Sequence, residues 1–598
     1  MQQWAGAKSR LRVVSEAGYK PNWPLGLGGE ALARIPGGII RPLRTASQPL
    51  SKELRRRTLV VASVLLAAFA LVSLQLVRLA ILGQGTEKMA AAEPVTRSFS
   101  RPDILDRNGR ILATDVVVPS VYADPLFVQD ADEATERLHD LFPEFDPREL
   151  RKNLADRGKR FVWIKRAVSP SLAQQVHELG LPGILFRNEL RRLYPSGPLA
   201  AHTLGQTDID NRGLGGLERS IDDKGMSELV HGGDRRQSAP MRLSLDVGVL
   251  YALRDELVGA MRDYEAAGAA GLVLDASSGA IIATASLPDF DPNQRGDREL
   301  SARLDKLTGG TYELGSVFKM LTIAMALDEG FATPDKVYDT RTPLQVGRFT
   351  IKDLHPQPQP LSVTDIFLHS SNVGAGMLAL QAGADRQRAF LGRLGLLAPM
   401  QIETGPLAAP QIPAHWESAE TVTISYGHGL AVAPLQFAAA AASLVNGGRR
   451  VVPSLLLSAE SPGPAEAVLA QVVSPETSAR IRDMLRLNVT ATHGTGRRAE
   501  VPGYRVGGKT GTAELAGKGG YRTNSVIASF LAAFPMDKPR YVTFVLVFEP
   551  KRIDEWRGQI TAGVNAAPVT SRLISRIAPI LGLTPRRVPA RLAEQGRN

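Results

Sequence analysis

Apolar residues recur in different patterns along the chain, and together these patterns predict an α+β fold. Residues 320–327 form a nearly unbroken apolar run, typical of the start of a buried helix. Residues 504–513 follow a Pro-Gly pair and show little helical period, which favours a strand. From 241 to 583 a strand region precedes helices and further strands, an order that suits an antiparallel sheet with helices on its faces.

The run 58–77 contains no charged residue, and at about 1.5 Å per residue a helix of this length spans a bilayer core of ~30 Å. Four basic residues lie just before it, Lys52, Arg55, Arg56 and Arg57. Because positive charge stays on the cytoplasmic side, we expect one membrane helix over 58–82, a cytoplasmic tail over 1–57 and an extracytoplasmic remainder. A cleaved secretion signal or twin-arginine export stays open.

The formal charge of +11 lies entirely in the two ends of the chain. Residues 1–57 carry eleven Lys or Arg against three Asp or Glu, and residues 584–598 carry four against one. The 526 residues between them are therefore neutral, whereas a nucleic-acid enzyme is expected to carry a basic folded part. We expect a membrane association, a basic C-terminal tail over 584–598 and no nucleic-acid partner.

Cysteine is absent from the 598 residues, so thiolate metal sites and cysteine nucleophiles are excluded. None of the nine histidines shows the His-Glu-x-x-His spacing. We expect no metal and no cofactor, and we interpret His428 and His493 as structural.

Three short motifs occur once each: Ser316-Val317-Phe318-Lys319, Ser370-Ser371-Asn372 and Lys509-Thr510-Gly511-Thr512. Serine and lysine three residues apart share one face of a helix, so Lys319 can reach the Ser316 hydroxyl. A lysine kept partly neutral by burial can accept a serine proton, which makes Ser316 the candidate nucleophile and Lys319 the general base.

The other two motifs supply groups for proton transfer and substrate binding. Ser370 and Asn372 are expected on a connection between helices, where the hydroxyl can relay a proton and the amide can hold a carbonyl. Lys509 is expected to offer a fixed positive charge to a carboxylate. Thr510 and Thr512 add hydroxyls, and Gly511 with its glycine neighbours leaves room for a substrate backbone.

In this order the motifs resemble those of penicillin-binding proteins and serine β-lactamases. Over residues 97–583 the chain is similar to class B high-molecular-mass penicillin-binding proteins, above all the division-specific penicillin-binding protein 3 branch. The segment 272–293 and the segment 425–448 resemble that transpeptidase domain. Three segments resemble the signatures of its pedestal: residues 101–109, Arg192 with Tyr194-Pro195, and residues 213–218. Pro102 and Leu314 depart from the usual pattern.

The resemblance implies a pedestal, or dimerisation-like, domain over 83–240 and a transpeptidase domain over 241–583. It further implies a D,D-transpeptidase of the bacterial inner membrane, with its catalytic domain in the periplasm, that crosslinks peptidoglycan stem peptides through a serine acyl-enzyme during septal wall synthesis. β-Lactams would acylate the same serine. We expect a SEDS-family membrane glycan polymerase and other division proteins as partners, because no glycosyltransferase domain fits ahead of the membrane helix.

Three alternatives stay open. The chain could be an elongation-specific transpeptidase, a D,D-carboxypeptidase or β-lactamase-like hydrolase with water as acceptor, or a non-catalytic division scaffold. The pedestal argues against the hydrolases, and the complete motif set argues against the scaffold. The turn Asp106-Arg107-Asn108-Gly109 suits a junction in which polar groups fix one module against another.

Overall fold

The computed structural model describes residues 52–82, 100–223, 239–294, 300–457, 470–517, 520–551 and 559–586. The chain divides into two compact units, residues 1–96 and residues 97–598. The expected tails fall largely outside the described residues, at 1–51 and 587–598.

In the first unit the described residues form one helix, α1 (Lys52–Leu82), which contains the uncharged run 58–77. Its large apolar side chains are exposed, for example Leu66 at 72% and Phe69 at 77%. Within the part of the chain that the structure describes, no helix combines the length and the apolar content needed to cross a membrane.

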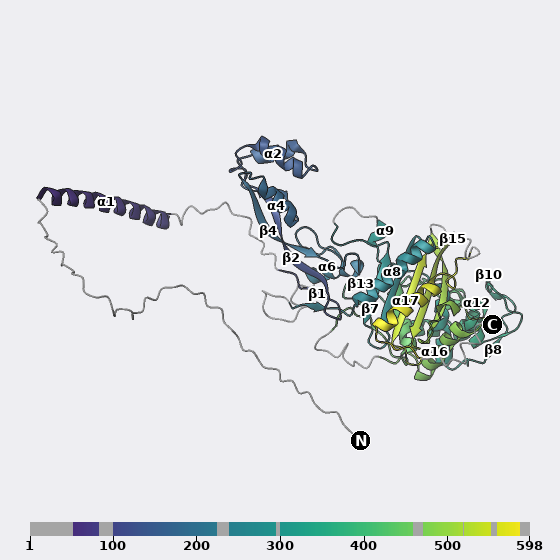
Figure 1. The fold of residues 1–598 in the computed structure, drawn as a ribbon. Coiled ribbons are helices and arrows are strands. Elements are labelled where there is room, and N and C mark those ends of the chain that lie inside the picture. The colour runs from purple at the N-terminus through teal and green to yellow at the C-terminus, as the bar shows by residue number, and fades with distance from the viewer. Residues whose placement is uncertain are drawn as a thin grey trace, which may run out of the picture. The chain divides into compact units, whose positions relative to one another are not determined.

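The first part of the second unit is built on a long antiparallel pair (Figure 1). Strand β2 (Ile111–Ala123) pairs with β4 (Ile184–Leu193) over ten residues and with β3 (Val162–Lys165) at its far end. Short strand β1 (Ile104–Leu105) joins β2 to β5 (Met241–Arg242), the latter in parallel. The helices of this region are α2 (Ala131–Leu141), α3 (Pro147–Ala155), α4 (Pro170–Glu178), α5 (Ala201–Leu204) and α6 (Gly216–Asp223).

Local sequence signals explain where three of these helices begin. Asp130, Asp146 and Ser169 each accept a backbone N–H bond as the N-cap of α2, α3 and α4, and proline follows the latter two caps. The buried faces of these helices form a small separate core with the ends of β2 and β3.

A buried ion cluster holds the base of this region together. Arg101 Nε and Arg192 Nε donate to the two oxygens of Glu218, each at 2.7 Å, and the three side chains are at most 4% exposed. Arg192 also contacts Asp115 at 3.2 Å. One residue from each of the three segments that carry the pedestal resemblance thus takes part in this cluster: Arg101, Arg192 and Glu218.

The turn at Asp106 connects the strands β1 and β2 to the start of helix α8 (Val247–Asp263). Asp106 Oδ1 accepts bonds from the backbone N–H groups of Asn108 and Arg110, and its Oδ2 accepts one from Val247 at the start of α8. Asn108 Nδ2 donates to Asp246, the N-cap of α8, at 2.9 Å. Polar groups therefore join the two modules, as the sequence predicts for this turn.

The main core surrounds a five-stranded antiparallel sheet in the order β14-β15-β16-β6-β7. Its strands are β14 (Gly507–Gly517), β15 (Gly520–Phe534), β16 (Tyr541–Phe548), β6 (Gly268–Asp275) and β7 (Ile281–Leu287). All eight residues of β16 are buried, so both faces of the sheet are covered. Helices α8 and α17 (Ala566–Ile580) contact the sheet, as do α15 (Pro434–Val445) and α16 (Pro475–Thr490) (Figure 1). The predicted antiparallel sheet with flanking helices is confirmed.

The remaining segments lie between β7 and β14. Helical ones are α9 (Leu300–Arg303), η2 (Gly315–Phe318), α10 (Lys319–Asp328), α11 (Val363–Leu368), α12 (Asn372–Ala382), α13 (Ala384–Arg393), α14 (Ser418–Ser425) and η3 (Arg497–Ala499). Short strand pairs are formed by β8 (Val337–Tyr338) with β11 (Leu361–Ser362), β9 (Leu344–Val346) with β10 (Phe349–Ile351), and β12 (Gln401–Ile402) with β13 (Gly405–Pro406).

The buried cluster generates a stability prediction. Glu218→Gln leaves two buried guanidinium groups without their shared carboxylate, so the free energy of unfolding should fall by about 3–5 kcal/mol. Asp223→Asn is the matched control, because its partner Arg219 and Asp223 itself are 65% and 64% exposed, and it should cost less than about 1 kcal/mol. Urea unfolding followed by circular dichroism measures both. Equal losses would contradict the role given to the cluster.

Candidate active site

Ser316 and Lys319 lie where β14 of the sheet meets the buried helix α10. Ser316 is in the four-residue 3-10 segment η2, and α10 begins at Lys319, so the predicted helix is preceded by a tighter turn. Every residue of α10 from Lys319 to Leu327 is buried, which confirms the buried helix predicted from the apolar run. Lys319 itself is fully buried.

Ser370 lies between α11 and α12, as expected, with a left-handed backbone at φ 58°. Asn372 is the first residue of α12, and Ser371 caps that helix by accepting a bond from Gly374 N. Asp353 secures the connection, because it accepts bonds from Ser371 Oγ at 2.6 Å and from the backbone N–H groups at the start of α12. Asp353 was not among the predicted site residues, since nothing in its local sequence marks it.

The Lys319 ammonium group connects the first two motifs. Its Nζ lies 2.7 Å from Ser316 Oγ and 2.7 Å from Asn372 Oδ1. It is also 2.8 Å from the Ser370 carbonyl oxygen and 3.2 Å from Ser370 Oγ. A proton can therefore pass between the Ser316 hydroxyl and Lys319 without movement of either side chain.

Lys509 lies on β14, which confirms the predicted strand, and its side chain contacts Ser370. Its Nζ is 3.0 Å from Ser370 Oγ, so Ser370 lies between the two lysines. Thr510 Oγ1 is bonded to Thr495 Oγ1 at 2.9 Å, and Thr512 Oγ1 accepts a bond from Ala562 N at 3.3 Å. β14 ends the strand order of the sheet, so its outer side has no strand partner among the described residues.

Asn488 of α16 holds β14 in place and was also missed. Its Nδ2 donates to the Gly508 carbonyl at 2.8 Å, and its Oδ1 accepts from Thr495 N and Oγ1. The side chain is fully buried. A buried amide with both ends satisfied fixes the position of the strand that it bonds.

Three glycines allow backbone segments to meet at the site. A Cβ at Gly315 would lie 2.4 Å from Thr512 O, one at Gly427 would lie 2.1 Å from Gly315 O, and one at Gly511 would lie 2.5 Å from Leu314 O. Each of these distances is too short for any side chain. The first motif, the third motif and the 425–429 segment are therefore in direct backbone contact.

The same measurements correct our interpretation of the glycines on β14. We expected Gly508 and Gly511 to leave room for a substrate backbone. A Cβ at Gly508 would instead lie 2.5 Å from the Phe530 ring, and the space at Gly511 is taken by the backbone of Leu314. Internal packing requires these glycines, because the protein itself fills the space beside them.

Burial sets the protonation of both lysines. Desolvation lowers the pKa of Lys319 well below its ordinary value, and the nearby charge of Lys509 lowers it further, against a smaller opposing effect of Asp353. Desolvation alone lowers the pKa of Lys509 to about 7. The positive charge that we expected to be fixed on Lys509 thus depends on pH near neutrality.

Three histidines, His369, His428 and His493, lie beside this centre. The His428 ring packs near Tyr426 and Tyr521, with centroids at 5.5 and 6.0 Å, and Glu313 accepts bonds from Gly429 N and the Tyr521 hydroxyl. His493 lies against His369, the residue before Ser370. Among the described residues, one group has the spacing of metal ligands: Asp365, His369 and His493.

This arrangement can perform acyl transfer by a serine nucleophile. It combines a serine hydroxyl in contact with a desolvated lysine, a second hydroxyl that joins two lysines, and a strand edge able to align an extended peptide. The five residues predicted as catalytic, together with Thr510, Gly511 and Thr512, come from three separate chain segments and meet in one place.

Comparison with known proteins gives two family matches. Residues 269–574 match the penicillin-binding protein transpeptidase domain, and residues 97–223 match the penicillin-binding protein dimerisation domain. Together they cover both modules of the second unit.

Several curated proteins resemble the chain over most of its length. The probable peptidoglycan D,D-transpeptidase FtsI of Caulobacter vibrioides is 38% identical, covering 81% of this chain and 82% of that protein. The probable peptidoglycan D,D-transpeptidase PenA of Neisseria meningitidis is 32% identical, covering 84% and 88%. The peptidoglycan D,D-transpeptidase FtsI of Escherichia coli K12 is 30% identical, covering 82% and 85%. The chain therefore belongs to the class B penicillin-binding proteins, in which a dimerisation domain precedes a transpeptidase domain.

Proposed function

We propose that this protein is a peptidoglycan D,D-transpeptidase of septal wall synthesis that crosslinks stem peptides through an acyl-enzyme on Ser316. One observation carries the proposal: Lys319 Nζ, fully buried and with a strongly lowered pKa, lies 2.7 Å from Ser316 Oγ. A lysine in that state can act as a base at neutral pH. Two relatives with D,D-transpeptidase FtsI in their names support the reaction and its place in division.

In the first half of the reaction Lys319 takes the Ser316 proton, and Oγ attacks the carbonyl carbon between the two terminal D-alanines. Backbone N–H groups of Ser316 and Thr512 are the proposed oxyanion donors, and such a donor is worth roughly 10²–10³ in rate. When the C–N bond breaks, Ser370 passes a proton from the lysines to the departing D-alanine. Its hydroxyl contacts the Nζ atoms of both lysines, which suits this relay.

In the second half an amine from a neighbouring stem peptide attacks the acyl-enzyme carbonyl. The same groups act in reverse: the amine loses a proton to Lys319, the new amide forms and Ser316 Oγ regains its hydrogen. Asn372, which lies 2.7 Å from Lys319, holds the base and is placed to bind a substrate amide. Lys509 in its protonated form, with Thr510 and Thr512, binds the carboxylate of the donor peptide or of a β-lactam.

We further propose that α1 anchors the chain in the inner membrane, with the N-terminus in the cytoplasm and the catalytic unit in the periplasm. The uncharged run 58–77, the exposed apolar side chains of α1 and the basic residues before it support this. A SEDS-family glycan polymerase and other division proteins are the proposed partners. Crosslinking requires newly made glycan strands, and the two matched domains are a transpeptidase domain and a dimerisation domain, neither of which is named for glycan synthesis.

The central prediction is that penicillin forms a covalent adduct on Ser316, because the strained lactam carbonyl would take the place of the substrate carbonyl. Mass spectrometry of a digest after penicillin treatment should find the added mass on the peptide that contains Ser316. Ser316→Ala should lose the adduct, while Ser301→Ala, on α9, should keep it. An adduct on another residue of the folded protein would refute the assignment.

The pKa of Lys509 predicts a pH profile. Acylation needs neutral Lys319 and protonated Lys509, so the second-order rate constant should fall at acid pH and fall again as the pH rises above about 7. Lys509→Arg keeps the charge at every working pH and should move the alkaline decline to higher pH. Exposed Lys538→Arg is the control and should keep the wild-type profile. An alkaline decline unchanged in Lys509→Arg would remove Lys509 from carboxylate binding.

The topology prediction concerns spheroplasts that express the full chain. Protease added outside should digest the chain beyond Arg78 and leave a membrane-bound fragment that reacts with an antibody against residues 1–50. Permeabilised cells should lose that fragment too. A soluble mature protein that lacks residues 58–77 would show instead that this run is a cleaved signal.

A further inference from the structure

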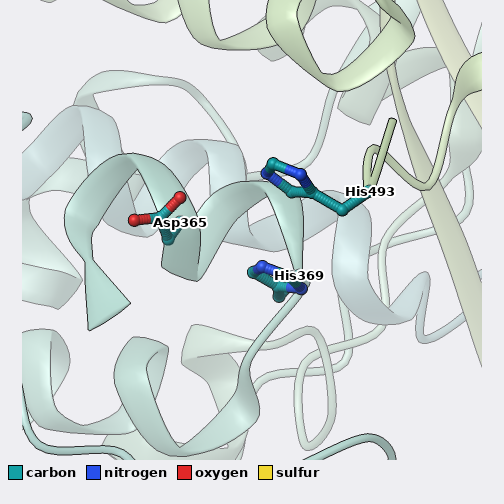
Figure 2. A group of neighbouring side chains, drawn as sticks. All are labelled: Asp365, His369 and His493. Carbon is teal, nitrogen blue, oxygen red and sulfur yellow. The ribbon is translucent and has the colours of Figure 1, made fainter. Parts of the chain in front are cut away.

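Three potential metal ligands lie beside the Ser370 connection and have no part in the acyl-transfer scheme. Asp365 is on α11, and His369 follows one turn later at the C-cap of the same helix, so the two side chains share a face. His493 comes from the segment after α16 and lies across from them (Figure 2). The three side chains thus come from two segments that are 124 residues apart in the sequence.

The three side chains lie close together. Among the described residues, neither imidazole ring packs against an aromatic ring other than its histidine neighbour. One ligand atom from each lies within 4.8 Å of the other two. The imidazole rings are stacked, with centroids 4.7 Å apart and an interplanar angle of 11°. Neither ring has a hydrogen bond to another described residue, so both have nitrogen atoms available for a ligand.

We propose that Asp365, His369 and His493 form a binding site for a divalent transition metal of the zinc class. One carboxylate oxygen and two imidazole nitrogens are a ligand set that zinc accepts, with water completing a tetrahedral shell. Bonds of about 2.0–2.2 Å in that geometry place ligand atoms about 3.4 Å apart, so ligand atoms that lie within 4.8 Å must approach by up to about 1.4 Å. His493 is exposed and can make that adjustment by side-chain rotation.

The hydrogen bonding of the carboxylate suits a metal ligand. Asp365 is held by the Ser362 hydroxyl, which donates to its Oδ2 at 2.6 Å. A hydrogen bond to the second oxygen of a carboxylate orients the ligand and leaves the first oxygen free.

The place of the site in the fold suggests what bound metal does. His369 directly precedes Ser370, and His493 is two residues before Thr495, whose hydroxyl bonds Thr510 on β14. A metal would therefore link the connection that carries the second motif to the segment that supports the third. We infer a structural clamp that fixes Ser370 relative to Lys509, a role independent of whether the chain acts by acyl transfer.

The test uses the full chain in detergent, made without a polyhistidine tag and freed of metal with EDTA. Isothermal titration with ZnCl₂ should show one equivalent bound tightly, and CoCl₂ should give the visible absorption of a tetrahedral site. His493→Ala should weaken the affinity at least about 100-fold, more than the loss of a second-shell group costs. Asp365→Asn is a second variant and should weaken it as well.

The control is His415→Ala, because His415 is exposed and lies outside the cluster. This variant should bind zinc as the wild type does. Zinc should also raise the melting temperature of the wild type and of His415→Ala, but not of His493→Ala. Tight binding that survives in both His493→Ala and Asp365→Asn, or no tight binding by the wild type, would overturn the proposal.

Discussion

The active centre depends on two lysine side chains that are completely removed from water. Burying an ammonium group is costly unless it finds hydrogen-bond acceptors or loses its proton, and here both occur. Lys319 is surrounded by the oxygens of Ser316, Ser370 and Asn372, and Lys509 shares the Ser370 hydroxyl. The low proton affinity that makes Lys319 a base follows from that burial.

Such burial requires the fold to bring rigid elements together from distant parts of the chain. Helix α10 surrounds Lys319 with buried and mostly apolar residues, and β14 places Lys509 against Ser370. Asp353 and Asn488 add no chemistry of their own but fix the two flanking segments by satisfying their backbone groups. Two desolvated lysines lower the stability of the folded protein, and functional centres commonly carry such a cost.

Much of this arrangement is readable from local sequence, because its main signals are local. The apolar run after Ser316 predicts the buried helix, and the patterns on either side of the motifs predict the connection at Ser370 and the strand at Lys509. Asp353 and Asn488 could not be found that way, since their function exists only through contacts made after folding. The glycines of β14 were misinterpreted for the same reason, because the atoms that crowd them belong to Phe530 and Leu314. Spacing rules likewise cannot detect a group such as Asp365, His369 and His493, because His493 meets the other two only after folding.

The backbone contacts among Gly315, Gly427 and Gly511 bear on how the protein can evolve under antibiotic selection. Any side chain at these positions would meet another backbone atom at 2.1 to 2.5 Å, so a substitution displaces substrate-binding and drug-binding segments together. Resistance mutations that preserve wall synthesis are therefore expected at residues whose side chains are not crowded by neighbouring backbone atoms. Tyr521, 49% exposed and held to Glu313 through its hydroxyl, is such a residue, because it lies beside the ring of His428 and outside the crowded backbone contacts.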